Sequence, residues 1–408
     1  MTRDDALALD AADPLARFRQ AFDLPEGLIY LDGNSLGPPP RATLARLADV
    51  AAREWGRDLI RSWNDNGWNA APLRVGAKIA RLIGANSDEV AVADSTSVNL
   101  FKLAAGALSL RPGRTTILSE TGNFPTDLYI LQGLVNLLPG VRLNAVDPAD
   151  VLAAIDEDTA VVVLTEVHYK SARRWDMAAL TAAAHAKGAL ILWDLSHSAG
   201  AVATDLNGCN ADLAVGCGYK YLNGGPGAPA YLFVAGRHQA AIKSPLNGWM
   251  GHAAPFEFGD NFHPAAGIRA QVTGTPSVLG LAALEAGVDL QLEADPAALE
   301  AKGLALGDLF IDLVETRCAG FGVGLASERG ARRGLHVALT HPEGYAIVQA
   351  LIARGVIGDF RAPDVLRFGF APLYLSRADI WDAVEILRDV LATRSWDTEA
   401  FRIRSAVT

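Results

Sequence analysis

The sequence predicts an α/β fold in which a large domain carries a mainly parallel sheet and a smaller domain is α+β. Between about residues 88 and 235, short apolar runs alternate with helical segments. Unbroken apolar runs of this kind are typical of parallel strands that helices cover on both faces. The C-terminal region combines two helical stretches, 296–318 and 376–394, with the strand-like segments GLHVALTHP and VLRFGFAP. With 408 residues the chain exceeds one compact core, which favours two domains.

Helical patterning also precedes the alternating region. A strand-like LIYLDG runs into the turn GNSLGPPP, and residues 41–57 and 72–84 then carry apolar side chains at three- and four-residue spacings. We expect a large domain over residues 56–285 and a small domain over residues 286–408. Residues 1–55 should pack with the small domain, by analogy with the fold.

Composition and charge exclude several classes of protein. The net charge is −10, with 36 basic against 46 acidic residues, so no basic excess exists to bind nucleic acid. The start of the chain has no signal-peptide pattern, and no apolar run reaches a membrane span, so we expect a soluble cytoplasmic protein. Cys209, Cys217 and Cys318 form no CxxC pair and the histidines form no HxxxH pair, so neither disulfides nor a metal site are expected.

A lysine and an aspartate follow two of the predicted strands. Ligands of parallel sheets bind beyond the carboxyl ends of the strands. Lys220, alone among seven lysines, lies between a buried strand and a glycine-rich loop, in GCGYKYLNGGPG. A Schiff-base lysine needs such a site because desolvation favours the neutral amine; a lysine that extends to water from a strand end is the alternative. Asp194, which ends the strand ALILWD, could pair with a pyridinium nitrogen or cap a helix. This ordered pair is typical of the aminotransferase-like fold that binds pyridoxal 5′-phosphate (PLP).

Other strand ends supply candidate cofactor contacts. Thr96 and Ser97 lie where a strand turns into a helix, whose free amides and dipole favour a phosphate, although helix capping could explain one of them. Phe124, in GNFPTD with Asp127, could stack on a pyridine ring or belong to the core. Thr165 ends the strand VVVLT and could reach the ring oxygen of the cofactor.

Two further residues have open alternatives. His197 follows Asp194 closely and could contact the phosphate or orient that aspartate, but it could equally be a turn histidine with local hydrogen bonds. Arg367 lies in the otherwise apolar strand VLRFGF, and its planar guanidinium suits a bidentate contact with an amino-acid carboxylate. An outward-facing strand arginine is the alternative.

These motifs together resemble the kynureninase family, over residues 28–394. The segments that carry the resemblance are IYLDGNSLGP, LIRSWNDNGWNAAP, NFPTD, WDLSHSAG, GYKYLNGGPG, NGWMGH and LRFGFAPLY. The resemblance is to the bacterial type, within the class V-like aminotransferase group. It implies a PLP-dependent transferase of fold type I.

The resemblance also implies roles for individual residues. Lys220 would form the Schiff base with PLP and, with Tyr219, carry protons. Asp194 and Asp127 would lie on the pyridine-nitrogen side, and Phe124 would stack on the ring. Phosphate or ring-oxygen contacts would come from Thr96, Ser97, Thr165, His197 and Tyr219. Trp249 and Thr275 would reach the cofactor of a neighbouring subunit, which implies a homodimer, and Arg367 would hold the substrate carboxylate.

The implied activity is the hydrolytic cleavage of L-kynurenine to anthranilate and L-alanine. It would serve tryptophan degradation or NAD biosynthesis. Animal members that prefer 3-hydroxykynurenine have an Asn in place of Thr275 and a His in the region of RSWNDNGW. We therefore expect the hydroxylated compound to be the poorer substrate.

Two rival functions stay open at this point. A cysteine desulfurase or selenocysteine lyase would share the fold, but it needs a reactive cysteine on a mobile loop and usually a histidine before the lysine, where this chain has Tyr219. A catalytically silent PLP-binding regulator is the other rival. This second rival is tested by whether Lys220 and Arg367 are both needed for turnover.

Overall fold

The computed structural model describes residues 1–404; residues 405–408, the end of the predicted small domain, lie outside the described residues. The chain divides into two compact units. Unit 1 comprises Met1–Arg41, Val167–Arg174 and the chain from Ala294, and unit 2 comprises Ala42–Glu166 and Trp175–Glu293. Within residues 1–404, no helix combines the length and the apolar character that crossing a bilayer requires.

Unit 2 is built on a seven-stranded sheet with the order β2-β8-β7-β6-β5-β3-β4. Only β8 runs antiparallel to its neighbours, and the other adjacent strands are parallel. The strands are β2 (Val90–Val92), β3 (Thr116–Glu120), β4 (Arg142–Val146), β5 (Thr159–Thr165), β6 (Leu190–Asp194), β7 (Leu213–Gly216) and β8 (Tyr231–Val234). The predicted mainly parallel sheet is confirmed.

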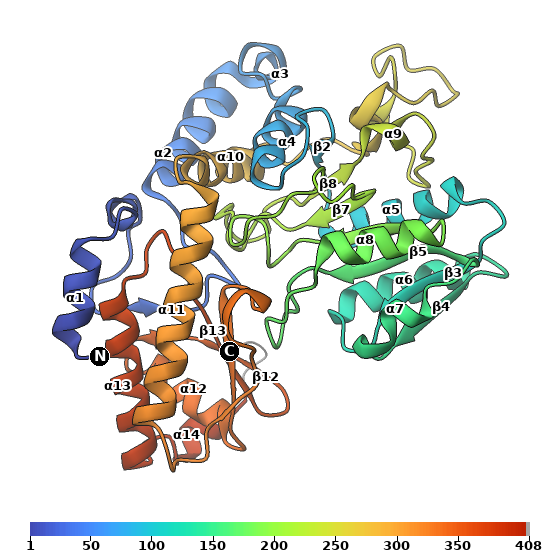
Figure 1. The fold of residues 1–408 in the computed structure, drawn as a ribbon. Helices are drawn as coiled ribbons and strands as arrows, with labels where there is room; N and C mark the ends of the chain where they lie inside the picture. The colour runs from blue at the N-terminus through green and yellow to red at the C-terminus, as the bar shows by residue number, and fades with distance from the viewer. Residues whose placement is uncertain (405–408) are drawn as a thin grey trace. The chain divides into compact units, whose positions relative to one another are not determined.

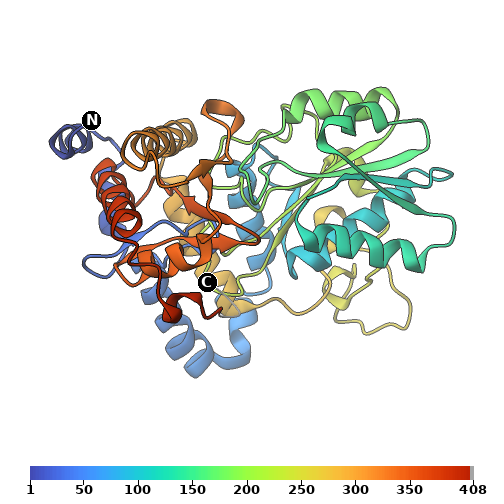
Figure 2. The ribbon, with the colours of Figure 1, turned by 90° about the horizontal axis from the view of Figure 1, so that it is seen from below.

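Helices cover both faces of this sheet (Figures 1 and 2). Successive strand residues point to opposite faces, so in β6 Ile191 and Trp193 join one core while Leu190 and Leu192 join the other. The first core is closed by α4 (Ala71–Leu82), α7 (Val151–Ala154), α8 (Met177–Ala186) and α10 (Val278–Leu292), and the second by α5 (Thr96–Leu110) and α6 (Pro125–Leu137). Burial of both faces explains why these strands appear as continuous apolar runs in the sequence.

The predicted helices ahead of the sheet are also present. Residues 41–57 form α2 (Arg41–Asp49) and a π-helical continuation (Val50–Asp58), followed by a short 3-10 turn and α3 (Ser62–Asp65). The predicted division placed residues 42–55 with the N-terminal segment, whereas here they belong to unit 2. The reason is that the π-helical turns contact α10.

Unit 1 contains a four-stranded antiparallel sheet with the order β12-β13-β10-β9. Its strands are β9 (Gly324–Leu325), β10 (His336–Thr340), β12 (Asp359–Arg361) and β13 (Val365–Gly369), and β1 (Ile29–Tyr30) pairs in parallel with β11 (Val356–Ile357). The helices are α1 (Arg3–Ala11), α11 (Pro296–Arg317), α12 (Gly344–Ile352), α13 (Arg377–Thr393) and α14 (Glu399–Arg402). The two helices and two strands predicted for the C-terminal region are confirmed as α11, α13, β10 and β13.

A buried carboxylate ties several segments of unit 2 together. Asp212 lies just before β7 and is 1% exposed. Its oxygens lie 2.8 Å from His185 Nε2 and 2.8 Å from His238 Nε2, and they accept hydrogen bonds from Arg237 Nη2 (2.7 Å) and the Ile191 amide (2.9 Å). Burial opposes the charge, but these donors outweigh it and lower the pKa of Asp212 to about 2.

We expect Asp212→Asn to lower the free energy of unfolding by about 2 kcal/mol at pH 7, because the depressed pKa equals that much stabilisation of the ionised form. The stabilisation is present above the ordinary carboxyl pKa of 3.8 and is lost as the pH falls through about 2. The difference between wild type and variant should therefore shrink between those pH values. Urea unfolding at several pH values measures it, with the exposed Asp150→Asn as a control that should change little. Equal stability of Asp212→Asn and wild type at pH 7 would contradict this account.

Candidate active site

The predicted site residues of unit 2 follow the carboxyl ends of neighbouring parallel strands. Phe124 and Asp127 follow β3, Thr165 ends β5, Asp194 ends β6, and Lys220 follows β7. Thr165 and Asp194 are direct partners in the pairing of β5 with β6. The topology therefore brings these five residues to one edge of the sheet.

Lys220 is buried, with 8% of its surface exposed. Its Nζ lies 5.9 Å from the centroid of the Phe124 ring and 5.7 Å from that of Tyr219. The loop that follows is tight: the Asn223 amide donates to the Lys220 carbonyl (3.0 Å). The side chain thus lies among aromatic rings, and the alternative of a lysine that extends into water does not fit.

Two carboxyl groups meet beside this lysine. Asp127 and Asp194 are 1% and 2% exposed, and the charge of Asp194 is close enough to act on Asp127. Burial, reinforced by the neighbouring Asp194 charge, raises the pKa of Asp127 well above its usual range. This shift favours the protonated form of Asp127. Asp194 accepts a hydrogen bond from the Ser196 amide (2.7 Å), which fixes the orientation of its carboxyl group.

Asn123 is a polar residue of this cluster that sequence reasoning missed. The Thr165 hydroxyl donates to Asn123 Oδ1 (2.6 Å) and lies 3.3 Å from Asp127 Oδ2. Asn123 Oδ1 also accepts from the Phe124 amide (2.8 Å), which fixes the backbone at the start of α6. Its position inside the GNFPTD motif was the available signal.

The proposed phosphate contacts lie at the start of α5. Thr96 and Ser97 are its first two residues, while the preceding Ser95 is the capping residue and accepts from the Val98 amide (3.4 Å). Ser95 is therefore the residue that caps the helix, and capping does not account for Thr96 or Ser97. The amides of the first helical turn have no acceptor within the helix, so this end of α5 suits an anion.

A buried ion pair holds the turn before α5. Lys102 is fully buried, and its Nζ donates to Asp94 Oδ2 (2.6 Å), the Gln271 carbonyl (2.7 Å) and Thr273 Oγ1 (3.4 Å). Asp94 has a positive φ of 51°, a conformation that costs energy in a non-glycine residue. Lys102 thereby ties the turn that leads into Thr96 to the loop that leads to Thr275.

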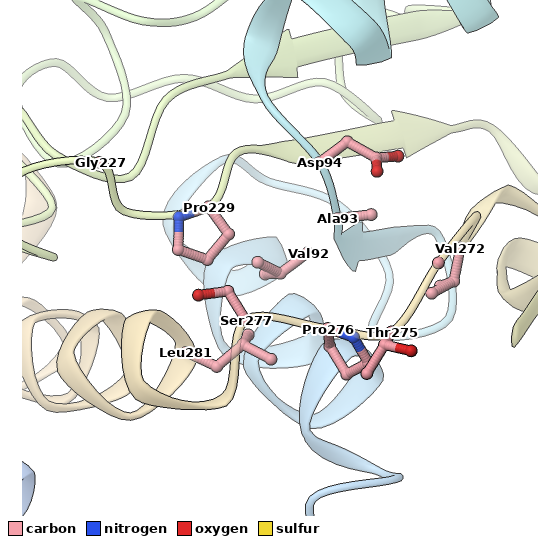
Figure 3. Close-up of a pocket in the computed structure, with 11 residues that line it drawn as sticks. Val92, Ala93, Asp94, Gly227, Pro229, Val272, Thr275, Pro276, Ser277 and Leu281 are labelled. Carbon is pink, nitrogen blue, oxygen red and sulfur yellow. The ribbon is translucent and has the colours of Figure 1, made fainter.

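A cavity of about 180 Å³ adjoins this turn (Figure 3). Asp94, Gly274, Thr275 and Ser277 contribute to its lining, together with apolar side chains such as Leu281. Of the predicted cofactor residues, Thr275 lines this cavity. Trp249 lies on another segment, the 3-10 turn Trp249–Gly251, where it is 42% exposed and stacks edge-on against Phe256 at 5.8 Å.

His197 and Tyr219 complete the predicted set in unit 2. His197 follows β6 and is buried, with 3% of its surface exposed. Tyr219 is half-buried, and the nearby Cys217 together with burial raises the pKa of its phenol. Tyr219 therefore keeps its proton over the physiological range, as a proton donor requires.

Arg367 lies in unit 1, on β13, and is 2% exposed. Its Nε and Nη2 bind both carboxylate oxygens of Asp359 (2.9 and 2.5 Å), Nη2 also donates to Ser35 Oγ (2.8 Å), and Nη1 donates to the Tyr169 carbonyl. A guanidinium has five N–H groups, so these contacts leave one N–H, on Nη1. The alternative of an outward-facing strand arginine does not fit, but neither does this arrangement offer two parallel N–H groups to a ligand.

The residues of unit 2 fit PLP. The buried amine of Lys220 beside an aromatic face, the buried carboxyl groups of Asp194 and Asp127, and the amides at the start of α5 match an aldehyde, a pyridinium nitrogen and a phosphate. Each group of the cofactor therefore has a chemically complementary partner among these residues.

Solved structures share this fold. The chain superposes on the cysteine desulfurase of Thermococcus onnurineus NA1 with a TM-score of 0.78 at 17% identity, covering 93% of this chain and 98% of that one. It superposes on the cystine C-S lyase C-DES, solved as a mutant with glycine covalently linked to its PLP cofactor, with a TM-score of 0.75 at 18% identity, covering 91% and 99%. The fold is therefore that of the PLP-dependent fold type I enzymes, as predicted.

Sequence comparison narrows the class. Kynureninases from Burkholderia mallei and Pseudomonas fluorescens are 52% and 51% identical to this chain over the full length of both proteins. Two family models also match: the kynureninase C-terminal domain over residues 299–387 and the DegT/DnrJ/EryC1/StrS aminotransferase family over residues 61–216. The chain belongs to the kynureninase family. The expected class, a PLP-dependent hydrolase acting on carbon–carbon bonds, and the expected cofactor are confirmed.

Apart from the shared fold, no observation supports the alternative of a cysteine desulfurase. At 17–20% identity the desulfurase structures share the fold alone. Cys217 and Cys318 are buried and Cys209 is half-buried. Burial raises the pKa of Cys318 to about 11 and also raises that of Cys209, so neither is poised as a thiolate.

Proposed function

We propose that this chain hydrolyses the Cβ–Cγ bond of L-kynurenine, giving anthranilate and L-alanine. The observation that carries the proposal is the full-length similarity to kynureninases at 52% identity, because the fold alone also serves desulfurases. The arrangement of Lys220, Phe124, Asp194 and Asp127 supports it, since this cluster can hold PLP.

The residues of the site have complementary tasks in this reaction. Bound PLP supplies an electron sink for the bonds at the substrate Cα. With PLP bound, Asp194 would hold a proton on the pyridine nitrogen and Phe124 would lie against the ring. Lys220 Nζ would be the base that removes the Cα proton. Water adds to the γ-carbonyl carbon of the substrate, the Cβ–Cγ bond breaks to release anthranilate, and Tyr219 and Lys220 would supply the proton that Cβ needs to become the alanine methyl group.

Arg367 binds the substrate carboxylate in this proposal. Its remaining Nη1–H supplies one hydrogen bond, and its charge supplies the attraction. Contacts from Thr96, Ser97, Thr165 and His197 to the phosphate or ring oxygen complete the cofactor site.

The preferred substrate is L-kynurenine itself, with 3-hydroxykynurenine as the poorer one. Thr275 and the RSWNDNGW segment support this preference, because they differ from the pattern of animal members. A higher kcat/KM for the hydroxylated compound would reverse it. The reaction would serve tryptophan degradation or NAD biosynthesis in the cytoplasm.

The active form is a homodimer in which Trp249 and Thr275 reach the partner's cofactor. Exposed aromatic side chains support an interface on unit 2: Phe256 and Phe258 are 65% and 78% exposed and stack edge-on with each other next to Trp249. Exposed apolar clusters of this kind mark association surfaces. Sedimentation of the holoenzyme measures the state, and a monomer with full activity would contradict it.

The first experiment mixes the protein and PLP with L-kynurenine. We expect loss of kynurenine absorbance with anthranilate fluorescence and L-alanine in equal amounts. A PLP spectrum without anthranilate would keep the cofactor and reject the reaction, whereas failure to bind PLP would reject the site.

A further inference from the structure

Asp359 is the direct partner of Arg367 across two strands of unit 1. In the pairing of β12 with β13 these two residues lie opposite each other, and Asp359 is 2% exposed. Its two carboxylate oxygens accept hydrogen bonds from Nε and Nη2 of Arg367. This bidentate contact fixes the plane of the guanidinium. The Arg361 guanidinium lies on the same carboxylate, 2.7 Å from Oδ2.

The DGNS turn of the N-terminal motif, residues 32–35, closes this cluster. Ser35 Oγ donates to Asp359 Oδ2 (2.6 Å) and accepts from Arg367 Nη2 (2.8 Å). The turn is held against β13 because the Gly369 amide donates to the Leu31 carbonyl (2.7 Å). The close approach of the Asn34 side chain favours glycine at position 369, since a Cβ there would require Asn34 to move. The DGNS turn is therefore fixed against the strand that carries Arg367.

Asp32 adds a second carboxyl group to the cluster. It lies in the same turn as Ser35, whose amide donates to the Asp32 carbonyl (2.9 Å), and two like charges this close disfavour ionisation of both acids. Its Oδ1 is buried and has no hydrogen-bond partner among the described residues. Burial and the Asp359 charge raise the pKa of Asp32 to about 8, while Arg367 outweighs the burial of Asp359 and lowers the pKa of that acid. Asp32 is thus the acid that holds the proton.

Two further titratable groups near the cluster do not change charge near neutral pH. Burial raises the pKa of Tyr30, with Asp32 and Asp359 contributing, so its phenol stays neutral. Burial and the Arg367 charge lower the pKa of His336, so its ring stays neutral too. With Arg361 and Arg367 positive and Asp359 negative, the cluster has a net charge of +1 while Asp32 is protonated and of zero once Asp32 ionises.

We infer that Ser35 and Asp359 are positioning residues for Arg367, and that a neutral Asp32 leaves the cluster the positive charge that attracts the substrate carboxylate. The inference rests on the proposed function, in which Arg367 binds that carboxylate. Asp359 and Ser35 occupy three of the five N–H groups of Arg367 and so direct the remaining face of the guanidinium. Ionisation of Asp32 above about pH 8 cancels the net charge, so affinity for an amino-acid carboxylate falls there.

The test compares the pH dependence of KM for L-kynurenine in the PLP-loaded wild type and in Asp32→Asn, which keeps the shape of the side chain but stays neutral. At pH 7 the two KM values should agree within about twofold. By pH 9.5 the wild-type KM should exceed that of the variant by on the order of threefold to tenfold, the effect of one charge in a partly hydrated site. The ratio of their kcat values should stay constant with pH, which a merely structural role of Asp32 would not produce.

The outcomes separate the inference from the proposed function. Because both proteins meet the same substrate, ionisation of the substrate itself cancels in the ratio. Asp312→Asn, a surface change in unit 1, is the matched control and should follow the wild type. Superposable KM profiles for wild type and Asp32→Asn overturn the inference and leave the function intact, whereas a wild type without kynurenine turnover at any pH overturns both. If Asp32→Asn does not fold, Asp32→Ser, which is also neutral, takes its place. The wild type alone also tests the inference, because a KM that does not change from pH 7 to 9.5 would overturn it.

Discussion

Lys220→Ala should lose kynurenine turnover by about 10⁴-fold or more, because one amine both anchors the cofactor and moves the Cα proton, and a single acid–base role is typically worth about 10²- to 10⁴-fold. The burial of Lys220 beside the Phe124 ring supports this role. The loss should appear in kcat rather than in KM alone. Anthranilate fluorescence under saturating kynurenine and PLP measures it.

The control for this variant is Lys243→Ala, which removes an exposed lysine of the same unit and should keep wild-type turnover. Absorbance of the bound cofactor supplies a second measurement. Lys220→Ala should still bind PLP without the spectrum of a Schiff base to the protein. A variant that keeps turnover within tenfold of the wild type would contradict the assignment of Lys220.

Much of the fold could be predicted because the central strands are buried on both faces. β5, β6 and β7 are short, largely apolar runs that alternate with helical segments, a pattern typical of strands covered on both faces. β4 was missed because its residues, RLNAV, are largely exposed at the edge of the sheet and carry no such run. The contribution of Val167–Arg174 to unit 1 was also missed, since long-range contacts leave no local pattern.

The positions of the candidate site residues of unit 2 could be predicted for a different reason. Parallel strands place whatever follows them at one edge, so Asp194 and Lys220 were found from strand ends alone. The environment of Arg367 could not be found in this way. Its partner Asp359 lies across a strand pairing, in a segment, DFR, with no recognisable motif. Register of this kind is decided by the folded sheet, and sequence spacing does not reveal it.

Asp194→Asn should lower kcat by about 10²- to 10³-fold, the usual cost of removing one preorganised charge from a catalytic site. The reason lies in the buried pair. Burial and the neighbouring Asp194 charge raise the pKa of Asp127 and favour its protonated form, so Asp194 is the member of the pair that we propose holds the pyridinium proton. An amide at position 194 cannot hold that proton, so the cofactor loses its strength as an electron sink. Turnover and cofactor absorbance, measured at saturating PLP, separate this loss from loss of the cofactor.

Asp127→Asn is the matched control, since it changes the other member of the same pair. An amide there replaces a carboxyl group that is already neutral, so kcat should fall by about tenfold or less. The two variants together test where the charge resides. If Asp127→Asn proves the more damaging change and Asp194→Asn is tolerated, the proton lies on Asp194 and the roles of the two acids are exchanged. If both are equally damaging, the pair acts as a single unit with a shared proton, because coupled carboxyl groups titrate together and neither residue then holds the charge alone.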